Sequence, residues 1–229
     1  MAVKNIVYTH SDYFDVLDIF LEQQKKFGID DIVIFSDKCS ENKNKHILYD
    51  SNLSYTEKLK SCLEQIDEEF IIYQHEDMFL YSKPNLKKVA GYLNKLNESN
   101  SDFIRLSKTG NCKLTPCEYS FCLWDIDPTS DDFFAVQPTI WRTKSLIKFL
   151  EESGESTIWD LELNSGKINS SVRGFLHYDG EPARGGHFDS CVWPYVATAI
   201  VKGKWNFREY DLELSKIDKI KQSKRGKFL

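Results

Sequence analysis

Three residues that can bind a metal ion or move a proton follow one another directly after a run expected to be buried. Residues 70–74 carry no charge, His75, Glu76 and Asp77 come next, and the chain turns apolar again at Met78. A carboxylate beside a buried strand loses hydration, so it persists there when it binds a cation, a hydrogen-bond donor or another charge. The pattern therefore favours a divalent metal site that holds a phosphate-bearing substrate. In the alternative interpretation, the Asp caps the next loop and the Glu pairs with a lysine.

Several sequence signatures of nucleotide chemistry are absent. The chain has no G-x-x-x-x-G-K-[ST] phosphate loop, no G-x-S-x-G serine elbow, and no G-x-G-x-x-G in the turn at residues 8–12. A turn without glycine cannot bring its backbone as close to a pyrophosphate, which disfavours dinucleotide dehydrogenases and P-loop kinases. Phosphate must then be neutralised in another way. Mg²⁺ commonly binds through one or two carboxylates and substrate phosphates, a role that Glu76 and Asp77 suit.

The elements that must position these acids are typical of an α/β fold. Strands and helices are expected to alternate in the first half, over residues 4–8, 11–27, 31–35, 54–66, 70–74 and 84–96. Ser54 and Glu57 have the spacing of a capping box at the start of the second helix. Ligands bind beyond the carboxyl ends of the strands in such sheets, which is where the acids after residues 70–74 would lie.

The pattern changes after Asn97 to a mixed one. Its expected elements are short strands around residues 103 and 133, helices over 143–151 and 156–165, a β-rich segment at 195–201 and a turn at 202–203. We expect one domain over residues 1–229, with a nucleotide-binding half at about 1–100, an acceptor half at about 101–215 and a basic tail at 216–229. A solvated tail is the default for such a charge run, and a helix extension or the start of a linker are the alternatives.

Composition excludes several classes of protein. The 229 residues are 41% hydrophobic, enough for a core, and the net charge of −5 gives no reason to expect nucleic-acid binding. With neither a transmembrane run nor a signal peptide, the chain is expected to be soluble and cytoplasmic. The six cysteines are expected to be free thiols. Cys112, Cys117 and Cys122 recur at five-residue intervals, which does not match the C-x-x-C spacing of zinc modules.

Four features make the chain resemble the GT-A class of glycosyltransferases, in which a strand ends in an acidic D-x-D-like motif that ligates Mn²⁺ or Mg²⁺ on a nucleotide-sugar diphosphate. They are the turn 9–13, the strand end 35–37, the acidic segment 74–77, and the segment 137–141 followed by 159–162. The resemblance covers most of the chain and is particularly to the small sugar transferases of large algal DNA viruses and related bacterial enzymes. The motif departs from the family pattern because His75 stands where the family often has its first acid.

The resemblance implies which residues hold the metal ion. Asp77 would be a direct ligand, Glu76 would act through water or orient the sugar, and the late His187 would close the site. Two glycines precede His187 and let the backbone approach a ligand closely. Taken alone, a histidine in such a sequence is more often a surface-loop residue.

The resemblance also implies a nucleotide site over the first strands. Thr9, His10 and Tyr13 would contact the base and ribose, and Asp37 a ribose hydroxyl. Lys58 or Lys60 would reach the diphosphate as a point charge. Tyr13 as a core residue, Asp37 as a turn residue and the lysines as a solvated helix face are the alternatives.

The second half carries the candidate catalytic residues. An inverting transferase needs a carboxylate base for the acceptor hydroxyl, whereas a retaining one does not need a base in that role. Asp160 and Glu162 are two residues apart on a short helix, so they point about 200° apart and cannot both face one cleft. Asp160 is the first choice, with Glu162 and Asp189 behind it. Trp141 and Trp159 are expected either to stack on sugars or to pack in the core.

The function expected from the sequence is a metal-dependent glycosyltransferase that moves a sugar from a nucleoside diphosphate sugar, with UDP expected, to a glycan or glycoprotein acceptor. One alternative is a sugar-phosphate nucleotidyltransferase, disfavoured because no glycine-rich basic loop follows the first strand. Another is a non-catalytic nucleotide-sugar or glycan-binding module of the same fold. The expected location would be the host cytoplasm if the chain is viral. Sequence leaves open the sugar, the acceptor, the stereochemistry, the oligomeric state and whether the chain belongs to a longer protein.

Overall fold

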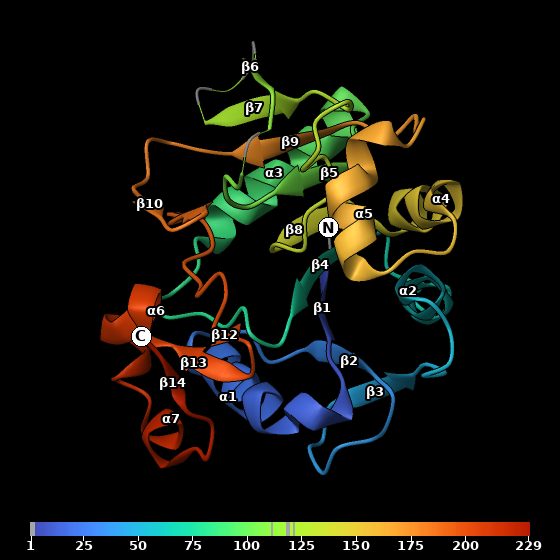
Figure 1. Cartoon of the computed structure of the whole chain (residues 1–229). Helices are drawn as coiled ribbons and strands as arrows, with labels where there is room; N and C mark the ends of the chain where they lie inside the picture. Colours follow the sequence, from blue (N-terminus) through green and yellow to red (C-terminus); the bar gives the residue numbers. More distant parts are fainter. Residues whose placement is uncertain (1–2, 111, 118–119, 121) are drawn as a thin grey trace.

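One mixed sheet unites both halves of the chain. The computed structural model describes residues 3–110, 112–117, 120 and 122–229. Within these residues, nine strands form the sheet in the order β3-β2-β1-β4-β8-β5-β9-β7-β6 (Figure 1). The strands are β1 (Val3–Tyr8), β2 (Ile32–Ser36), β3 (Lys45–Leu48), β4 (Phe70–His75), β5 (Phe103–Arg105), β6 (Leu114–Pro116), β7 (Leu123–Ile126), β8 (Thr139–Arg142) and β9 (Gly174–His177).

The helices and the short strands complete the fold. The helices are η1 (Ser11–Tyr13), α1 (Phe14–Lys26), α2 (Tyr55–Leu63), α3 (Leu86–Ser99), α4 (Thr143–Ser153), α5 (Ile158–Asn164), η2 (Ser165–Lys167), α6 (Phe207–Leu214) and α7 (Asp218–Gln222). The short strands are β10 (Ala183–Arg184), β11 (His187–Phe188), β12 (Ile200–Val201), β13 (Lys204–Asn206) and β14 (Lys227–Phe228). None of the helices within the described residues is both long enough and apolar enough to cross a bilayer.

The sheet has a parallel part and a mixed part. β1 pairs in parallel with β2 and β4, and β2 with β3. β8 lies antiparallel between β4 and β5, and β9 pairs in parallel with β5. The strand that joins the two parts, β8, comes from the second half of the sequence. The expected α/β class, with alternating strands and helices in the first half and a mixed second half, is therefore confirmed.

The local sequence explains several of these elements. The capping box expected at α2 is present: Ser54 accepts a hydrogen bond from the Glu57 backbone N–H, and the Glu57 carboxylate accepts one from the Ser54 N–H at 2.9 Å. Lys202 and Gly203 both have positive φ and form the expected turn between β12 and β13. Asn100 ends α3 in the left-handed conformation that asparagine tolerates.

Other expectations are corrected. The segment expected as a polar loop after residue 37 contains β3, an edge strand in which Ile47 is the one buried residue and which therefore lacks an apolar pattern. The strand expected around residue 133 is instead β8, a few residues later. The helix expected over 156–165 is shorter, because Thr157 caps α5 at Ile158, and α4 begins at Thr143 without a side-chain cap.

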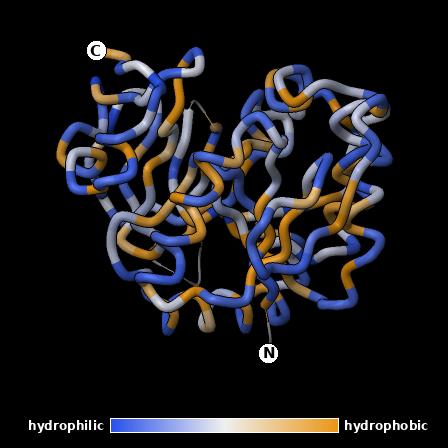
Figure 2. The backbone as a smooth tube through the Cα atoms, turned by 90° about the horizontal axis from the view of Figure 1, so that it is seen from below, coloured by the Kyte–Doolittle hydropathy of each residue, from blue (hydrophilic) through white to orange (hydrophobic). Residues whose placement is uncertain are grey.

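Aromatic residues fill the core where the two parts of the sheet meet. Trp141 on β8 is 2% exposed and stacks on Phe103 of β5, with ring centroids 4.3 Å apart. Phe133 and Phe149 lie against the same group. Hydrophobic segments run through the interior and hydrophilic ones along the periphery (Figure 2). Trp141 is thus a core residue rather than a surface for a sugar.

Residues 216–229, expected by default as a solvated tail, fold back onto the first helix. β14 pairs in parallel with β13, and Ile220 on α7 is buried. Arg225 donates from Nε and Nη2 to the two carboxylate oxygens of Asp15, both at 2.7 Å, and from Nη2 to the Asp12 carbonyl at 2.9 Å. The many lysines of residues 216–229 suggested a solvated tail, although the segment also carries the apolar Ile220, which is buried.

Two glycine substitutions test the packing. A Cβ on Gly174 in β9 would lie 2.3 Å from the ring of buried Phe103, so Gly174→Ala is expected to destabilise the fold by about 1–3 kcal/mol. Gly91 lies on an exposed face inside α3 with nothing within 4 Å of such a Cβ, so Gly91→Ala is expected to stabilise by up to about 1 kcal/mol. Urea unfolding measures both; equal effects would contradict the packing of β9 on β5.

Candidate active site

The carboxyl ends of the three central parallel strands lie at one level. Tyr8, near the end of β1, is in register with both Phe35 on β2 and His75 on β4. The residues after these three positions therefore meet at one edge of the sheet. Glu76 and Asp77 follow β4 directly at this edge, where α/β sheets bind their ligands.

A cavity of about 390 Å³ opens beside the acids. It collects Glu76 and Asp77 from the end of β4, Glu162 from α5 and His187 from β11. The full lining is Tyr13, His75, Glu76, Asp77, Met78, Val136, Gln137, Ile158, Trp159, Glu162, His187, Thr198 and Ile200. Side chains from both halves of the chain thus face one space.

Burial dominates the electrostatics of the acid pair. Glu76 is 8% exposed, and its Oε2 is buried without a hydrogen-bond partner in the part of the chain that the structure describes. Burial, and then the neighbouring charge of Asp77, raise the pKa of Glu76 well above its usual range. Burial also raises the pKa of Asp77, although a hydrogen bond from the Ile200 backbone opposes this. A cation in the cavity would relieve both costs.

His75 is held in a cluster of tyrosines. Its Nε2 hydrogen-bonds to the hydroxyls of Tyr73 at 2.8 Å and Tyr55 at 3.2 Å, and its ring stacks on Tyr8 with centroids 5.2 Å apart. Burial lowers the pKa of His75 to about 3, so the ring is neutral near pH 7. The imidazole at the first position of the acidic motif therefore already has hydroxyl partners at Nε2.

A tight hairpin presents His187. Gly185, with φ of +60°, lies in the turn between β10 and β11, where a side chain would be strained. His187 Nδ1 lies 3.5 Å from Gln137 Nε2, and its Nε2 lies 3.4 Å from Thr198 Oγ1. Burial lowers the pKa of His187, so the ring is neutral and able to ligate a metal ion.

Two carboxylates and a neutral imidazole suit Mn²⁺ or Mg²⁺ in their chemistry. The ligating atoms of Glu76, Asp77 and His187 do not all lie within 4.8 Å of one another. The three residues face one cavity without forming a closed cage. Such a site fits an ion that completes its coordination with substrate phosphates. The roles of Asp77, Glu76 and His187 stay predictions.

The expected nucleotide residues gather at the same edge, with structural roles of their own. Asp37 accepts hydrogen bonds from the Ser11 N–H at 2.6 Å and the Ser11 hydroxyl at 2.8 Å. Burial raises the pKa of Asp37, but these hydrogen bonds outweigh it and the pKa is lowered. His10 Nδ1 accepts from the Asp12 N–H and caps η1, and Thr9 is buried. Asp37 thus ties the β1 turn to the end of β2.

Tyr13 lines the cavity and carries a cation on its ring. The Arg225 guanidinium lies 4.8 Å from the centroid of that ring, and its charge lowers the pKa of Glu76. Arg225 was not predicted as a site residue from the sequence. Its one signal was being the arginine in a lysine-rich segment.

The lysines of α2 lie apart from the cavity. Lys58 Nζ is 5.7 Å from the Tyr49 ring centroid, and Lys60 pairs with Glu151 of α4 at 2.9 Å. Neither lysine is among the residues that line the cavity.

Of the three candidate bases, Glu162 lines the cavity. Its Oε1 accepts a hydrogen bond from the Val136 N–H at 2.6 Å, and burial raises its pKa. Asp160 is exposed and accepts a hydrogen bond from Thr157 at the start of α5. Asp189 lies outside the cavity lining and pairs with Arg184 at 3.3 Å. The structure thus separates the first-choice base from the cavity and brings in the second.

The tryptophans divide between core and rim. Trp159 lines the same cavity and is 71% exposed, whereas Trp141 is in the core. A large exposed aromatic ring at the rim of a polar cavity provides an apolar face for a ligand.

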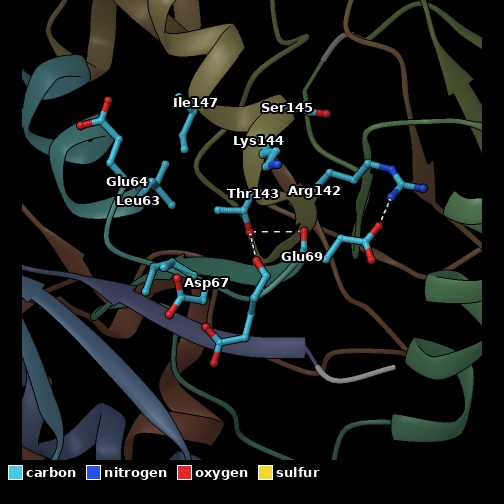
Figure 3. Close-up of a pocket in the computed structure, with 11 residues that line it drawn as sticks. Leu63, Glu64, Asp67, Glu69, Arg142, Thr143, Lys144, Ser145 and Ile147 are labelled. Atoms are coloured by element: carbon cyan, nitrogen blue, oxygen red, sulfur yellow. Dashed lines mark hydrogen bonds and ion pairs between the residues drawn. The ribbon is translucent and has the colours of Figure 1, made fainter.

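A larger cavity, of about 580 Å³, lies at the opposite end of β4 between α2 and α4 (Figure 3). Several of its polar groups are already paired: Arg142 with Glu69 at 2.5 Å, and the Thr143 hydroxyl with the Glu68 carbonyl at 2.6 Å. It holds none of the predicted site residues.

Comparison with known proteins identifies the fold. No protein-family model matches the chain, and no curated protein matches it in sequence. A structure of S. aureus TarS 1–349 is 18% identical, with 87% of this chain and 61% of that chain covered and a TM-score of 0.51. A longer S. aureus TarS structure is 17% identical over 78% of this chain and 35% of that chain, with a TM-score of 0.51. The CMP:2-keto-3-deoxy-manno-octonic acid synthetase complexed with CTP is 10% identical over 76% and 89%, with a TM-score of 0.50.

These likenesses concern the fold alone. The matched region is less than two thirds of either TarS chain. The fold is a GT-A-like nucleotide-binding fold, as the sequence predicted. The narrower resemblance to sugar transferases of algal viruses has no counterpart in the comparisons and stays a prediction.

The buried acid predicts how stability changes with pH. The folded pKa of Glu76 is raised, so its ionisation disfavours the fold, and stability is lost as pH rises above the ordinary value of 4.5 toward the folded pKa. Removing a buried unpaired group of this kind gains about 1–3 kcal/mol. In EDTA, Glu76→Gln is therefore expected to melt several degrees above the wild type at pH 8 and at nearly the same temperature at pH 4. Exposed Glu41→Gln is the control, and a destabilised Glu76→Gln at pH 8 would contradict the burial cost.

Proposed function

We propose that the chain is a metal-dependent glycosyltransferase that takes its sugar from a nucleoside diphosphate sugar, and that the nucleoside diphosphate is UDP. One observation carries the proposal: Glu76, whose Oε2 is buried without a partner among the described residues, lines a cavity together with Asp77, His187 and Glu162. The cavity opens beyond the carboxyl ends of parallel strands in a nucleotide-binding fold. A buried carboxylate whose burial cost exceeds what its neighbours offset favours a cationic ligand in that position.

The donor end of the cavity would be built from the first half of the chain. Asp77 and Glu76, with His187 opposite, would hold Mn²⁺ or Mg²⁺. The bound ion would neutralise the charge that develops on the leaving diphosphate. The Tyr13 ring lies beside the acids and has an aromatic face for a base or ribose. Arg225 stands on that ring as a second cation within reach of a phosphate.

Glu162 is the residue we assign as the base of an inverting transfer. Its Oε1 is held by the Val136 N–H, which orients the carboxylate and leaves Oε2 for an acceptor hydroxyl. Its raised pKa brings a carboxylate closer to neutral pH, as a general base requires. The acceptor oxygen bonds to the anomeric carbon and its proton passes to Glu162. The bond from that carbon to the diphosphate breaks, and its electron pair leaves on the diphosphate.

The exposed ring of Trp159 would receive the acceptor. It lies three residues before Glu162 on α5, so the two side chains are neighbours on one helix face. Stacking a sugar on Trp159 would bring its hydroxyls toward the carboxylate. The acceptor class this favours is a glycan.

Substitution of Asp77 tests the metal role. Asp77→Ala is expected to abolish Mn²⁺-dependent donor binding while the protein stays folded, because the ligand is lost from an open cavity rather than from the core. Calorimetry with UDP-, GDP- and dTDP-sugars, with and without Mn²⁺, measures this. UDP-GlcNAc is the first donor to use, since S. aureus TarS 1–349 has been crystallised with it.

The matched control is Asp30→Ala, an exposed loop residue before β2. Unchanged Mn²⁺-dependent binding in Asp77→Ala would remove the metal assignment. Release of pyrophosphate from a nucleoside triphosphate and a sugar phosphate, with no transfer from a nucleotide sugar, would instead indicate a nucleotidyltransferase.

Two carboxylates of α5 test the base. Glu162→Gln is expected to lower kcat by about 10²- to 10⁴-fold with donor binding retained, since it removes a general base but not a donor contact. Asp160→Asn, two residues earlier and exposed, is expected to keep most of its activity. Steady-state kinetics with a glycan acceptor compare them, and the reverse order of the two variants would return the role to Asp160.

A further inference from the structure

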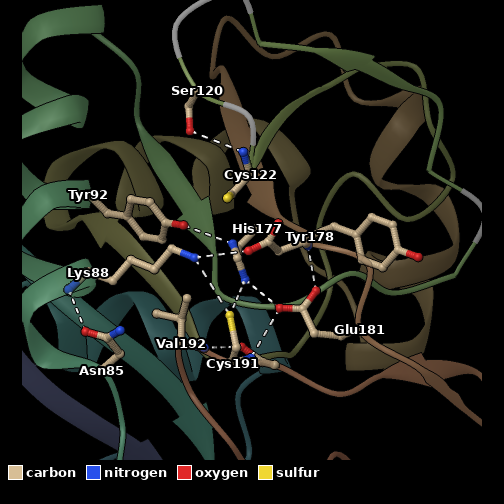
Figure 4. Close-up of polar contacts among 12 residues, drawn as sticks. Asn85, Lys88, Tyr92, Ser120, Cys122, His177, Tyr178, Glu181, Cys191 and Val192 are labelled. Atoms are coloured by element: carbon tan, nitrogen blue, oxygen red, sulfur yellow. Dashed lines mark hydrogen bonds and ion pairs between the residues drawn. The ribbon is translucent and has the colours of Figure 1, made fainter.

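A second group of ligating side chains lies away from the cavity, at the end of β9 (Figure 4). His177 is the last residue of β9, and Glu181 and Cys191 follow it along the chain. His177 Nε2 lies 2.8 Å from Glu181 Oε1 and 3.3 Å from Cys191 Sγ. The ligating atoms of all three residues lie within 4.8 Å of one another.

The three atoms converge on one point rather than forming a relay. In a thiol–imidazole–carboxylate triad, the thiol and the carboxylate contact opposite ring nitrogens. Here Glu181 and Cys191 both contact Nε2 of His177, and Nδ1 instead hydrogen-bonds to the Tyr92 hydroxyl at 2.9 Å. This arrangement does not activate a thiol. It surrounds a point that a cation can occupy.

The surroundings of His177 are those of a ligand fixed in place. Its side chain is completely buried. If Nδ1–H donates to the Tyr92 hydroxyl, the Nε2 lone pair faces Glu181 and Cys191, which is the tautomer that binds metal ions. Lys88 Nζ is 3.7 Å from Cys191 Sγ and 3.7 Å from the Asp179 carboxylate, so a positive charge already lies at the rim of the group.

We propose that His177, Glu181 and Cys191 form a zinc site. Tetrahedral Zn²⁺ with bonds of about 2.0 Å to nitrogen and oxygen and about 2.3 Å to sulfur separates its ligand atoms by roughly 3.3–3.6 Å. His177 Nε2 and Cys191 Sγ, 3.3 Å apart, are already close to this separation, whereas His177 Nε2 and Glu181 Oε1, 2.8 Å apart, would have to separate by about half an ångström. A thiolate with an imidazole and a carboxylate favours Zn²⁺ over Mg²⁺ or Ca²⁺. The fourth position opens to solvent on the side of Cys191, which is exposed.

Zinc at this point would close a loop that serves the candidate active site. Glu181 and Cys191 flank the hairpin of β10 and β11, which carries His187 into the cavity. Joining both flanks to the end of β9 would fix the base of that hairpin. The ion would therefore have a structural role that does not depend on the transferase proposal.

Metal analysis of the purified chain tests the site. The protein is stripped with a chelator, dialysed against Zn²⁺ and measured for bound metal. One tightly bound zinc per chain is expected in the wild type and in Cys39→Ser, an exposed cysteine elsewhere, and none in Cys191→Ser. Replacement by Co²⁺ is expected to give a thiolate charge-transfer band that Cys191→Ser lacks.

Further variants separate this site from the acid pair. Asp77→Ala is expected to keep its zinc, and Glu181→Gln to weaken zinc binding at least tenfold while remaining folded. Zinc retained by Cys191→Ser, or lost from Asp77→Ala, would overturn the proposal. A wild type that binds no zinc would also overturn the proposal. The positive charge of Lys88 would then be what offsets the negative charge of this group.

Discussion

The burial of two adjacent carboxylates is the constraint on which the rest of the site depends. Glu76 and Asp77 follow the central strand β4 without an intervening turn residue, so the sheet buries Glu76 and half-buries Asp77 as it forms. A fold selected for stability alone would place apolar or hydrogen-bonded groups there. A bound cation would offset the free-energy cost of burying these carboxylates. Strain of this kind at a ligand site is common in proteins.

The sheet also determines why a cavity exists beside these acids. β8 enters antiparallel between β4 and β5, which continues one sheet from the first half of the chain into the second. The segments that follow β8 in sequence then bring α5 and the β10–β11 hairpin over the end of β4. Glu162 and His187 reach the acids in this way, although more than 80 residues separate each of them from Asp77. The two halves of the chain therefore share one sheet and one cavity.

Elements that depend on neighbouring residues were predicted from the sequence. The run before His75 and the Ser54 capping box placed β4 and α2, because burial and helix capping are written in adjacent residues. Helical geometry also indicated that one of Asp160 and Glu162 faces a cleft, but not which one. That choice depends on the rotation of α5 about its axis, which packing sets and the sequence of the helix does not.

Several contacts between distant segments were not predicted. The group at His177 joins residues whose spacings match no zinc motif, and β3 has too few apolar residues to be recognised. Arg225 was hidden in a charge run because the partner that orders it, Asp15, lies 210 residues earlier. A single sequence carries no record of such pairs.

That last contact also has a consequence for biosynthesis. A ribosome releases the chain from its N-terminus, so β1, α1 and the acid pair emerge well before Arg225. The parallel strands near the N-terminus are close in sequence and can pair early, whereas closing a loop of 210 residues is slow and costly in chain entropy. Tyr13 and Glu76 gain their neighbouring guanidinium only after Arg225 has been synthesised. A nascent chain would thus have its first parallel strands paired beside an unfinished, strongly acidic pocket.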